Sequence, residues 1–299
     1  MPAFPRAQVC FNGAMPPRRR FRLRLPSRTL VLGERTLVMG VINVTPDSFS
    51  DGGRYFDADS ATDRALAMER EGADLIDIGG ESTRPGSQGV SMQEEIRRVL
   101  SVIVRLRRKL KIPISIDTQK SAVAEAAVGA GAEIINDVSA LRTDPELASV
   151  ARRHDLPLVL MHMRGRPRTM QKLPFARNVL ADVTRGLRDA LSRARNAGLP
   201  KSRLILDPGI GFGKSYQQNC ELLARLRELA QLGCPLLVGA SRKSFIGKLL
   251  GDAPADRRMW GTAAAVTASI LGGAHIVRVH DVAEMVQVAL IADRILQEM

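Results

Sequence analysis

A chain of 299 residues is long for one average domain but ordinary for a single α/β barrel. Its composition, 45% hydrophobic and 25% charged, is that of a globular protein, and no apolar run reaches the ~18 residues of a membrane-spanning helix. The three cysteines, Cys10, Cys220 and Cys234, have neither metal-site nor disulfide spacing, which is typical of the reducing cytoplasm.

The first 28 residues form a basic segment that we expect to be a disordered extension. The net charge of the chain is +13. The segment before Gly33 supplies seven of these charges, because it contains seven arginines and no acidic residue. The remaining +6 suits an enzyme that acts on anionic substrates. Nucleic-acid contact or a transit peptide is the alternative for Arg18–Arg20, and Met15 is an alternative start. We favour a solvated tail, with the folded domain spanning residues 29–299.

Short apolar segments alternate with longer helical patterns along the folded part. Thr29–Thr36 is expected to form a small hairpin that caps the barrel floor. The predicted buried strands are Val38–Asn43, Leu75–Gly79, Ile112–Asp117, Ile134–Asp137, Leu158–Met163, Leu204–Asp207, Leu236–Ala240 and Ile276–His280. Eight continuous apolar strands, each followed by a helical pattern, predict a parallel sheet that closes into a single (β/α)8 TIM barrel.

A weak internal repeat supports the barrel. Residues 72–77, 131–136 and 273–278 share a template in which a glycine ends a helix and an apolar pair enters a buried strand. Asp77, Asn136 and Arg278 occupy the same position of this template. We therefore expect these three side chains at one height near the carboxyl ends of the strands, where barrel enzymes perform their chemistry.

Polar residues follow nearly every predicted strand, and each has a purely structural alternative. Asp117, Asn136 and Asp207 could cap the helices that follow them. His162 is expected to be an ordinary buried barrel residue. Arg278 and His280 lie two positions apart on one strand, so both should face the barrel interior, where a cation beside a histidine is hard to explain by packing.

The segment from Gly209 to Ser215 has the look of a phosphate-binding loop. A nucleotide P-loop needs four residues between its first glycine and the Gly-Lys pair. Gly209 leaves only three before Gly213-Lys214, and the preceding position is Pro208. The nucleotide-binding interpretation therefore fails.

The motifs in order are NVTPDSFSDGG, GGESTRPG, SIDT, INDVS, MHM, LDPGIGFGK, SRKSFIG and VRVHD. Together they resemble the dihydropteroate synthases, from about Leu30 to the end of the chain. Because independent loops all agree, the resemblance is specific. It implies a transferase of folate biosynthesis that condenses 6-hydroxymethyl-7,8-dihydropterin pyrophosphate with p-aminobenzoate. We expect a monofunctional enzyme of the bacterial type, without a fused pterin kinase or aldolase.

The resemblance implies a set of pterin contacts. A carboxylate can accept adjacent N–H groups of the pterin's aminopyrimidine edge in bidentate fashion. The polar contacts implied in this way are Asp117, Asn136, Asp207 and Lys243. Met161 and Phe212 are the expected apolar walls of the ring site.

The resemblance also implies residues for the pyrophosphate and the second substrate. Asn43 matches the family's Mg²⁺ position, and Thr83, Arg278 and His280 match its pyrophosphate contacts. Ser244 and Arg84 are candidates for the aminobenzoate side. Loops after the first two strands should close and exclude water. These loops carry Pro46, Asp47, Phe49, Asp51, Arg84 and Pro85, and the residues expected to act in catalysis are Asp47, Asp51, Lys243, Arg278 and His280.

Two other function classes remain open from the sequence. A pterin-binding methyltransferase would share the pterin-edge acids but would not need the pyrophosphate clamp of Ser241–Lys243 and Arg278–His280. A non-catalytic paralogue would keep the fold without turnover. The resemblance further implies a homodimer, with no membrane or nucleic-acid partner.

Overall fold

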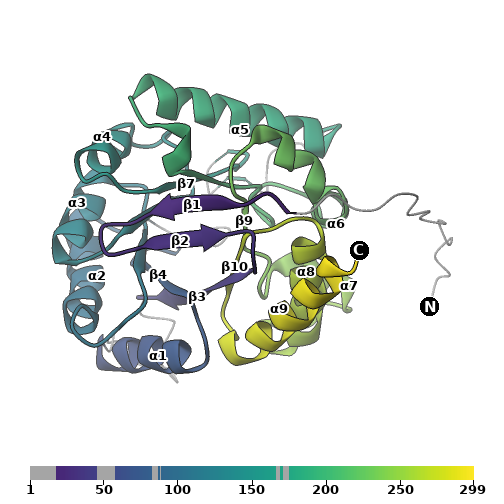
Figure 1. The fold of residues 1–299 in the computed structure, drawn as a ribbon, viewed down its shortest axis with the longest axis horizontal. Coiled ribbons are helices and arrows are strands. Elements are labelled where there is room, and N and C mark those ends of the chain that lie inside the picture. The colour runs from purple at the N-terminus through teal and green to yellow at the C-terminus, as the bar shows by residue number, and fades with distance from the viewer. Residues whose placement is uncertain (1–17, 46–57, 83–86, 88, 166–168, 171–174) are drawn as a thin grey trace, which may run out of the picture.

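Eight parallel strands form the centre of the fold, with helices around them (Figure 1). The computed structural model describes residues 18–45, 58–82, 87, 89–165, 169–170 and 175–299. The hydrogen-bonded strand order is β8-β7-β6-β5-β4-β3-β10-β9. A parallel bridge between Leu206 and Leu236 joins the two ends of this order. The predicted single barrel is therefore confirmed.

The elements follow one another in the β/α alternation that the sequence predicts. The strands are β1 (Phe21–Arg24), β2 (Thr29–Leu32), β3 (Leu37–Asn43), β4 (Leu75–Gly79), β5 (Ile114–Asp117), β6 (Ile134–Asp137), β7 (Leu158–Met161), β8 (Leu204–Asp207), β9 (Leu237–Val238) and β10 (Ile276–Val279). The α-helices are α1 (Ala58–Arg70), α2 (Met92–Leu106), α3 (Ser121–Ala130), α4 (Glu146–Arg153), α5 (Val179–Asn196), α6 (Tyr216–Ala224), α7 (Ser244–Leu249), α8 (Met259–Leu271) and α9 (Val282–Gln297). The 3₁₀ turns are η2 (Lys201–Arg203), η3 (Leu226–Leu232) and η4 (Ala255–Arg257).

The strands are buried along their length because helices cover one side of each strand and the barrel interior covers the other. The repeat template is confirmed in the backbone: Gly72, Gly131 and Gly273 all have positive φ angles, of 102°, 123° and 94°. The largest departure from the predicted strands is β9, which contains only Leu237 and Val238 of the expected Leu236–Ala240.

An antiparallel hairpin of β1 and β2 closes the bottom of the barrel, with Phe21 opposite Leu32 and Arg24 opposite Thr29 (Figure 1). Leu23, Leu25 and Leu32 are buried in a cluster with the first residues of the barrel strands. A hairpin was expected here, but within Thr29–Thr36; its first strand lies instead in the segment assigned to the extension.

Residues 18–28 consequently belong to the folded domain, and the expectation of disorder is wrong for them. Arg18 Nη1 donates to Thr36 Oγ1 at 2.8 Å and to the Ala274 carbonyl at 2.7 Å, and its Nη2 is 3.0 Å from Asp293 Oδ1. The physical reason is the alternation of Phe21, Leu23 and Leu25 with arginines, which buries one face of a strand. Residues 1–17 lie outside the described part of the chain.

Among the described helices, none has the length and hydropathy of a bilayer-spanning segment.

Candidate active site

Buried polar side chains gather at the carboxyl ends of the barrel strands. Asp77 lies in the middle of β4, Asp117 ends β5, Asn136 lies in β6 and Asp207 ends β8. All four are at most 9% exposed. Burial of so many polar groups in one layer requires partners for them, since an unpaired buried polar group is costly.

Arg278 on β10 links this cluster. Its Nε donates to Asp77 Oδ2 at 2.6 Å, and its Nη2 donates to Asp117 Oδ2 at 2.8 Å. Asn136 Nδ2 donates to the same Asp77 oxygen at 2.9 Å. The repeat template placed Asp77, Asn136 and Arg278 at one height, and their direct hydrogen bonds confirm that placement.

The helix-cap alternative is wrong for Asp117, Asn136 and Asp207. The helices that follow them begin several residues later, and Lys120, Pro145 and Ser215 occupy the N-cap positions. Asp207 Oδ1 instead accepts the backbone N–H of Gly209 at 2.7 Å, within the turn that leaves β8. The three polar side chains therefore do not cap the helices that follow them.

Two carboxyl groups of the site have strongly raised pKa values. Burial raises the pKa of Asp117 to about 7, with the Arg278 guanidinium opposing the shift and the Asp77 carboxylate adding to it. Burial also raises the pKa of Asp207 to about 6, opposed by the backbone N–H of Gly209 and by nearby Lys243. Perturbed groups of this kind, close together at a barrel's carboxyl end, mark a ligand site.

An apolar wall stands beside the carboxylates. Met161, at the end of β7, is the Cα partner of Asp207 and packs in one buried cluster with Phe212. Lys243 Nζ lies 4.0 Å from the centre of the Phe212 ring, a cation–π distance. The two expected walls therefore lie together. The other members of the cluster are Val138, Met163 and Met170.

Lys214 has a structural setting that the sequence did not reveal. Its buried Nζ donates to the carbonyls of Gly209 at 2.8 Å, Phe212 at 3.0 Å and His162 at 3.3 Å. Burial lowers the pKa of this ammonium to about 7. The amine thus donates to backbone oxygens of its own loop and of His162, and it holds this loop against the end of β7.

The Gly209–Gly213 loop touches β7 closely. A Cβ at Gly209, whose φ is +67°, would lie 1.9 Å from the His162 carbonyl oxygen, so only glycine fits there. His162 is buried, as expected of a barrel residue, and its Nε2 lies 3.6 Å from Asp182 Oδ2. Burial lowers the pKa of His162 to about 2, so the ring is neutral.

His280 and Ser244 follow the last two strands of the barrel. His280 Nδ1 lies 2.9 Å from Ser241 Oγ, and burial together with Arg278 lowers its pKa to about 3. A neutral imidazole beside Arg278 can donate or accept a hydrogen bond without adding charge repulsion. Ser244 is exposed at the first residue of α7.

Asn43 ends β3 beside Gly79 of β4 and is half-buried. Within the described ranges, no group of three or more His, Cys, Asp or Glu side chains is arranged to hold a metal. The remaining predicted residues, Asp47, Phe49, Asp51, Thr83, Arg84 and Pro85, lie outside the described residues, as does Pro46.

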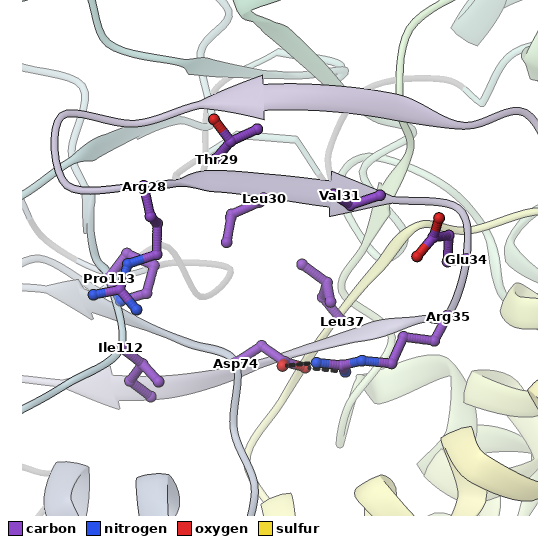
Figure 2. A pocket seen from close by; sticks show the side chains of 10 residues that line it. All are labelled: Arg28, Thr29, Leu30, Val31, Glu34, Arg35, Leu37, Asp74, Ile112 and Pro113. Atoms are coloured by element: carbon purple, nitrogen blue, oxygen red, sulfur yellow. Dashed lines mark hydrogen bonds and ion pairs between the residues drawn. The ribbon is translucent and has the colours of Figure 1, made fainter.

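A separate cavity of about 560 Å³ lies at the other end of the barrel, under strand β2 (Figure 2). Its lining includes Leu30, Val31, Arg35, Asp74 and Pro113, and Arg35 Nη1 donates to Asp74 Oδ2 at 2.8 Å. Asp74 and Pro113 precede β4 and β5, so this cavity is at the amino ends of the strands. The cluster of buried polar side chains lies at the carboxyl ends of the strands, where the active sites of barrel enzymes are found.

Comparison with known proteins gives a consistent result. Residues 39–280 match the family model for pterin-binding enzymes. A dihydropteroate synthase of Synechocystis is 49% identical over 261 residues, which cover 87% of this chain and 90% of that protein. A Yersinia pestis dihydropteroate synthase structure with a sulfonamide drug complex has a TM-score of 0.87 at 43% identity, covering 93% of this chain and 100% of that one. A Xanthomonas albilineans dihydropteroate synthase structure with 4-aminobenzoic acid has a TM-score of 0.85 at 45% identity, covering 94% and 98%.

Proposed function

The chain belongs to the dihydropteroate synthases within the pterin-binding enzymes, and from that membership we propose the reaction that it catalyses. It condenses 6-hydroxymethyl-7,8-dihydropterin pyrophosphate with p-aminobenzoate, giving 7,8-dihydropteroate and pyrophosphate. The observation that carries this proposal is the layer of Asp77, Asp117, Asn136 and Arg278 joined by hydrogen bonds at the carboxyl ends of the strands.

The pterin ring is recognised through its polar edge. We assign Asp117, Asn136 and Asp207 to the ring's N–H and acceptor groups, and Lys243 to its acceptor side. Their burial supports this assignment, because buried polar groups that match a ligand reject analogues lacking the matching groups. Met161 and Phe212 form the apolar walls, as their shared cluster suggests.

The pyrophosphate leaves from the carbon attached to the ring, and its developing charge must be stabilised. We assign this role to Arg278 and His280, with Thr83 as a further contact. Arginine suits the role because its planar guanidinium binds phosphate oxygens in bidentate fashion. The hydrogen bond from Arg278 to Asp117 supports an anion site next to the proposed pterin site.

Mg²⁺ fits this site through the chemistry of its oxygen donors. Mg²⁺ is commonly held by one or two protein oxygens, substrate phosphates and waters, so it does not require a cluster of acidic side chains. Asn43, at the end of β3, would supply an amide oxygen. A bound Mg²⁺ supplies positive charge that neutralises pyrophosphate.

The aminobenzoate approaches from outside the pterin. We assign Ser244 and Arg84 to this substrate, and we propose that the loops bearing Asp47, Phe49, Asp51 and Pro85 take part in catalysis by excluding water. The exposed position of Ser244 at the start of α7 supports its accessibility to a second substrate. Sulfonamides, which resemble p-aminobenzoate in shape, should compete with it.

We also propose that the protein is a homodimer and that it resides in the cytoplasm. Trp260 is 78% exposed at the start of α8, and Leu249 and Leu250 at the end of α7 are 52% and 51% exposed. Leu250 lies close to the start of α8, since a Cβ at Gly261, the residue after Trp260, would be 3.3 Å from Leu250 Cδ1. Exposed large apolar side chains of this kind support an interface between protein chains. The free thiols of Cys220 and Cys234 support a reducing compartment.

One assay tests the proposed reaction. Purified full-length protein is incubated with the pterin pyrophosphate, p-aminobenzoate and Mg²⁺, and dihydropteroate is measured by chromatography. We expect product that requires all three components and decreases with added sulfonamide. Pterin binding without product in any of these conditions would favour the methyltransferase or the silent paralogue. Sedimentation analysis of the same sample, beside a Trp260→Asp variant, tests the dimer.

A further inference from the structure

Asp77 has no role in the reaction proposed above, although it lies at the centre of the site. It is fully buried in β4, and neither its spacing nor the family resemblance assigns it a ligand. Its Oδ2 accepts two hydrogen bonds, from Asn136 Nδ2 at 2.9 Å and from Arg278 Nε at 2.6 Å. Its Oδ1 is buried without a hydrogen-bond partner among the described residues.

A carboxylate in this position lowers the stability of the fold. A smaller or apolar residue would avoid that cost, so the carboxylate calls for a function of its own. Burial of an ionised group is unfavourable even when it is paired, and the unpartnered Oδ1 adds to that cost. The two bonds to Oδ2 join side chains from two other strands, β6 and β10. One oxygen therefore fixes the geometry of two groups that we assign to the substrate.

The first group is the Asn136 amide. An amide has one donor end and one acceptor end, and only the hydrogen-bond network decides which end faces the ligand. Because the Nδ2 end is bound to Asp77, the Oδ1 end is directed away from Asp77. Asn136 therefore presents an acceptor, which is what an N–H group of the pterin edge requires.

The second group is the Arg278 guanidinium. Two donors of its planar fork are taken by two different carboxylates, Nε by Asp77 and Nη2 by Asp117. Contacts at two nitrogens of the guanidinium fix its plane as well as its position. A guanidinium held in this way loses less conformational entropy when it binds phosphate oxygens than a mobile one.

We infer that Asp77 is a positioning residue, which sets the orientation of Asn136 for the pterin and of Arg278 for the pyrophosphate through a single oxygen. This inference rests on the function proposed above. It is not a catalytic residue, since both of its contacts are to side chains of the protein.

The charge of Asp77 has a second, separable effect. After burial itself, the charges that act on Asp117 are Arg278 on β10, Asp77 on β4, Glu95 on α2 and Lys243 after β9. Arg278 and Lys243 lower the pKa of Asp117, whereas Asp77 and Glu95 raise it. Removing the charge at position 77 should therefore lower the pKa of Asp117, and pterin binding should persist to lower pH.

Two variants separate the hydrogen bonds from the charge. Asp77→Ala removes both hydrogen bonds. Asp77→Asn keeps the volume and one acceptor oxygen for Asn136 and Arg278, and its amide nitrogen can occupy the position of the unpartnered Oδ1. Ser115→Ala is the matched control, because Ser115 is the Cα partner of Asp77 on β5 and its buried hydroxyl likewise has no partner among the described residues.

The measurements are calorimetric titration with 6-hydroxymethyl-7,8-dihydropterin across a pH series, and steady-state kinetics with both substrates. We expect Asp77→Ala to weaken pterin binding at least about tenfold and to lower kcat, as loss of buried hydrogen bonds predicts. Asp77→Asn should restore affinity to within about threefold of wild type and shift the acidic limit of binding to lower pH. Ser115→Ala should bind and turn over normally.

Asp77→Ala protein that melts cooperatively yet binds pterin like wild type would overturn the inference. It would also be overturned if Asp77→Asn bound as weakly as Asp77→Ala, because an acceptor oxygen would then be insufficient. An acidic limit unchanged in Asp77→Asn would contradict the charge effect. Wild-type protein that does not bind pterin at all would instead contradict the proposed function.

Discussion

Arg278 donates from Nη2 to Asp117 Oδ2 across 2.8 Å, so the side chain assigned to the pyrophosphate touches one assigned to the pterin. The contact crosses the barrel interior, from β10 to β5. In the substrate, the pyrophosphate is joined to the pterin through one carbon. Under the proposed assignments, a pyrophosphate group and a pterin group that touch each other match this connectivity.

Arg278→Lys should lower turnover by roughly 10²-fold, the scale seen when a preorganised electrostatic contact is removed. A lysine carries the same charge but cannot contact Asp77 and Asp117 with a planar fork. Binding of a pterin that lacks the pyrophosphate should survive. Steady-state kinetics and pterin titration measure the two effects. Arg105→Lys, at an exposed ion pair with Asp59, is the control and should behave as wild type. Near-normal turnover by Arg278→Lys would show that the pyrophosphate contact is misassigned.

Asp207→Asn should weaken pterin binding by ~1.5–3 kcal/mol, because it removes the charge from a buried hydrogen bond to the ring. The turn should survive, since the asparagine oxygen can still accept the Gly209 N–H. Asp137→Asn is the matched control: Asp137 is also buried at a strand end, but both of its oxygens accept backbone N–H groups, from Ser139 at 2.7 Å and from Leu141 at 2.5 Å. The control should change stability without changing pterin affinity. Calorimetry that finds equal affinity for Asp207→Asn and wild type would remove Asp207 from the pterin site.

The pH dependence of stability tests the raised pKa of Asp207. In the folded chain that pKa is about 6, against 3.8 for an ordinary aspartate. Between these values the unfolded chain loses its proton first, so this group's contribution to stability falls as pH rises from about 4 to about 6. Asp207→Asn has no such group. Its Tm relative to wild type should therefore increase between pH 4.5 and pH 8, as measured by scanning fluorimetry, and a relative decrease would indicate a lowered pKa.

The sequence predicted the barrel well because each strand is a continuous buried run with clear ends. It also placed Asp77, Asn136 and Arg278 together, since the repeat template keeps their height in the barrel. The role of Asp77 was missed because a buried aspartate that contacts only other side chains has no local pattern. Lys214 was missed for a related reason: its partners are carbonyls of a loop whose path the sequence does not reveal. Strand β1 was not predicted because the arginines of this segment suggested a solvated tail. Its apolar residues alternate with these arginines, and that period of two is the signal of a strand.

Lys214→Met should weaken pterin binding at least about tenfold and lower Tm. The substitution leaves buried carbonyls of Gly209, Phe212 and His162 without their shared donor, and each such loss costs ~1–3 kcal/mol. The loop that carries Phe212 and the Gly209 N–H, which binds Asp207, should then shift. Lys248→Met, at an exposed pair with Asp252, is the control for loss of a lysine charge and should leave both quantities unchanged. A Lys214→Met protein with lowered Tm but normal affinity would limit Lys214 to stability.

The last prediction concerns the corrected start of the folded domain. Removing residues 1–17 retains the hairpin and Arg18, whereas removing residues 1–28 deletes β1 together with the buried side chains of Leu23 and Leu25. Full burial of one leucine is worth ~1.5–3 kcal/mol, and the deletion also leaves Leu32 and Met39 without part of their cluster. The deletion further removes the Arg18 contact to Asp293 on α9. We therefore expect the shorter deletion to melt like the full chain and the longer one to melt at a clearly lower temperature or to aggregate. Both proteins can be compared by calorimetry at equal concentration, with pterin binding as a test of the intact site. Equal Tm values for the two deletions would mean that the hairpin contributes nothing to stability and that the original boundary at residue 29 was sufficient.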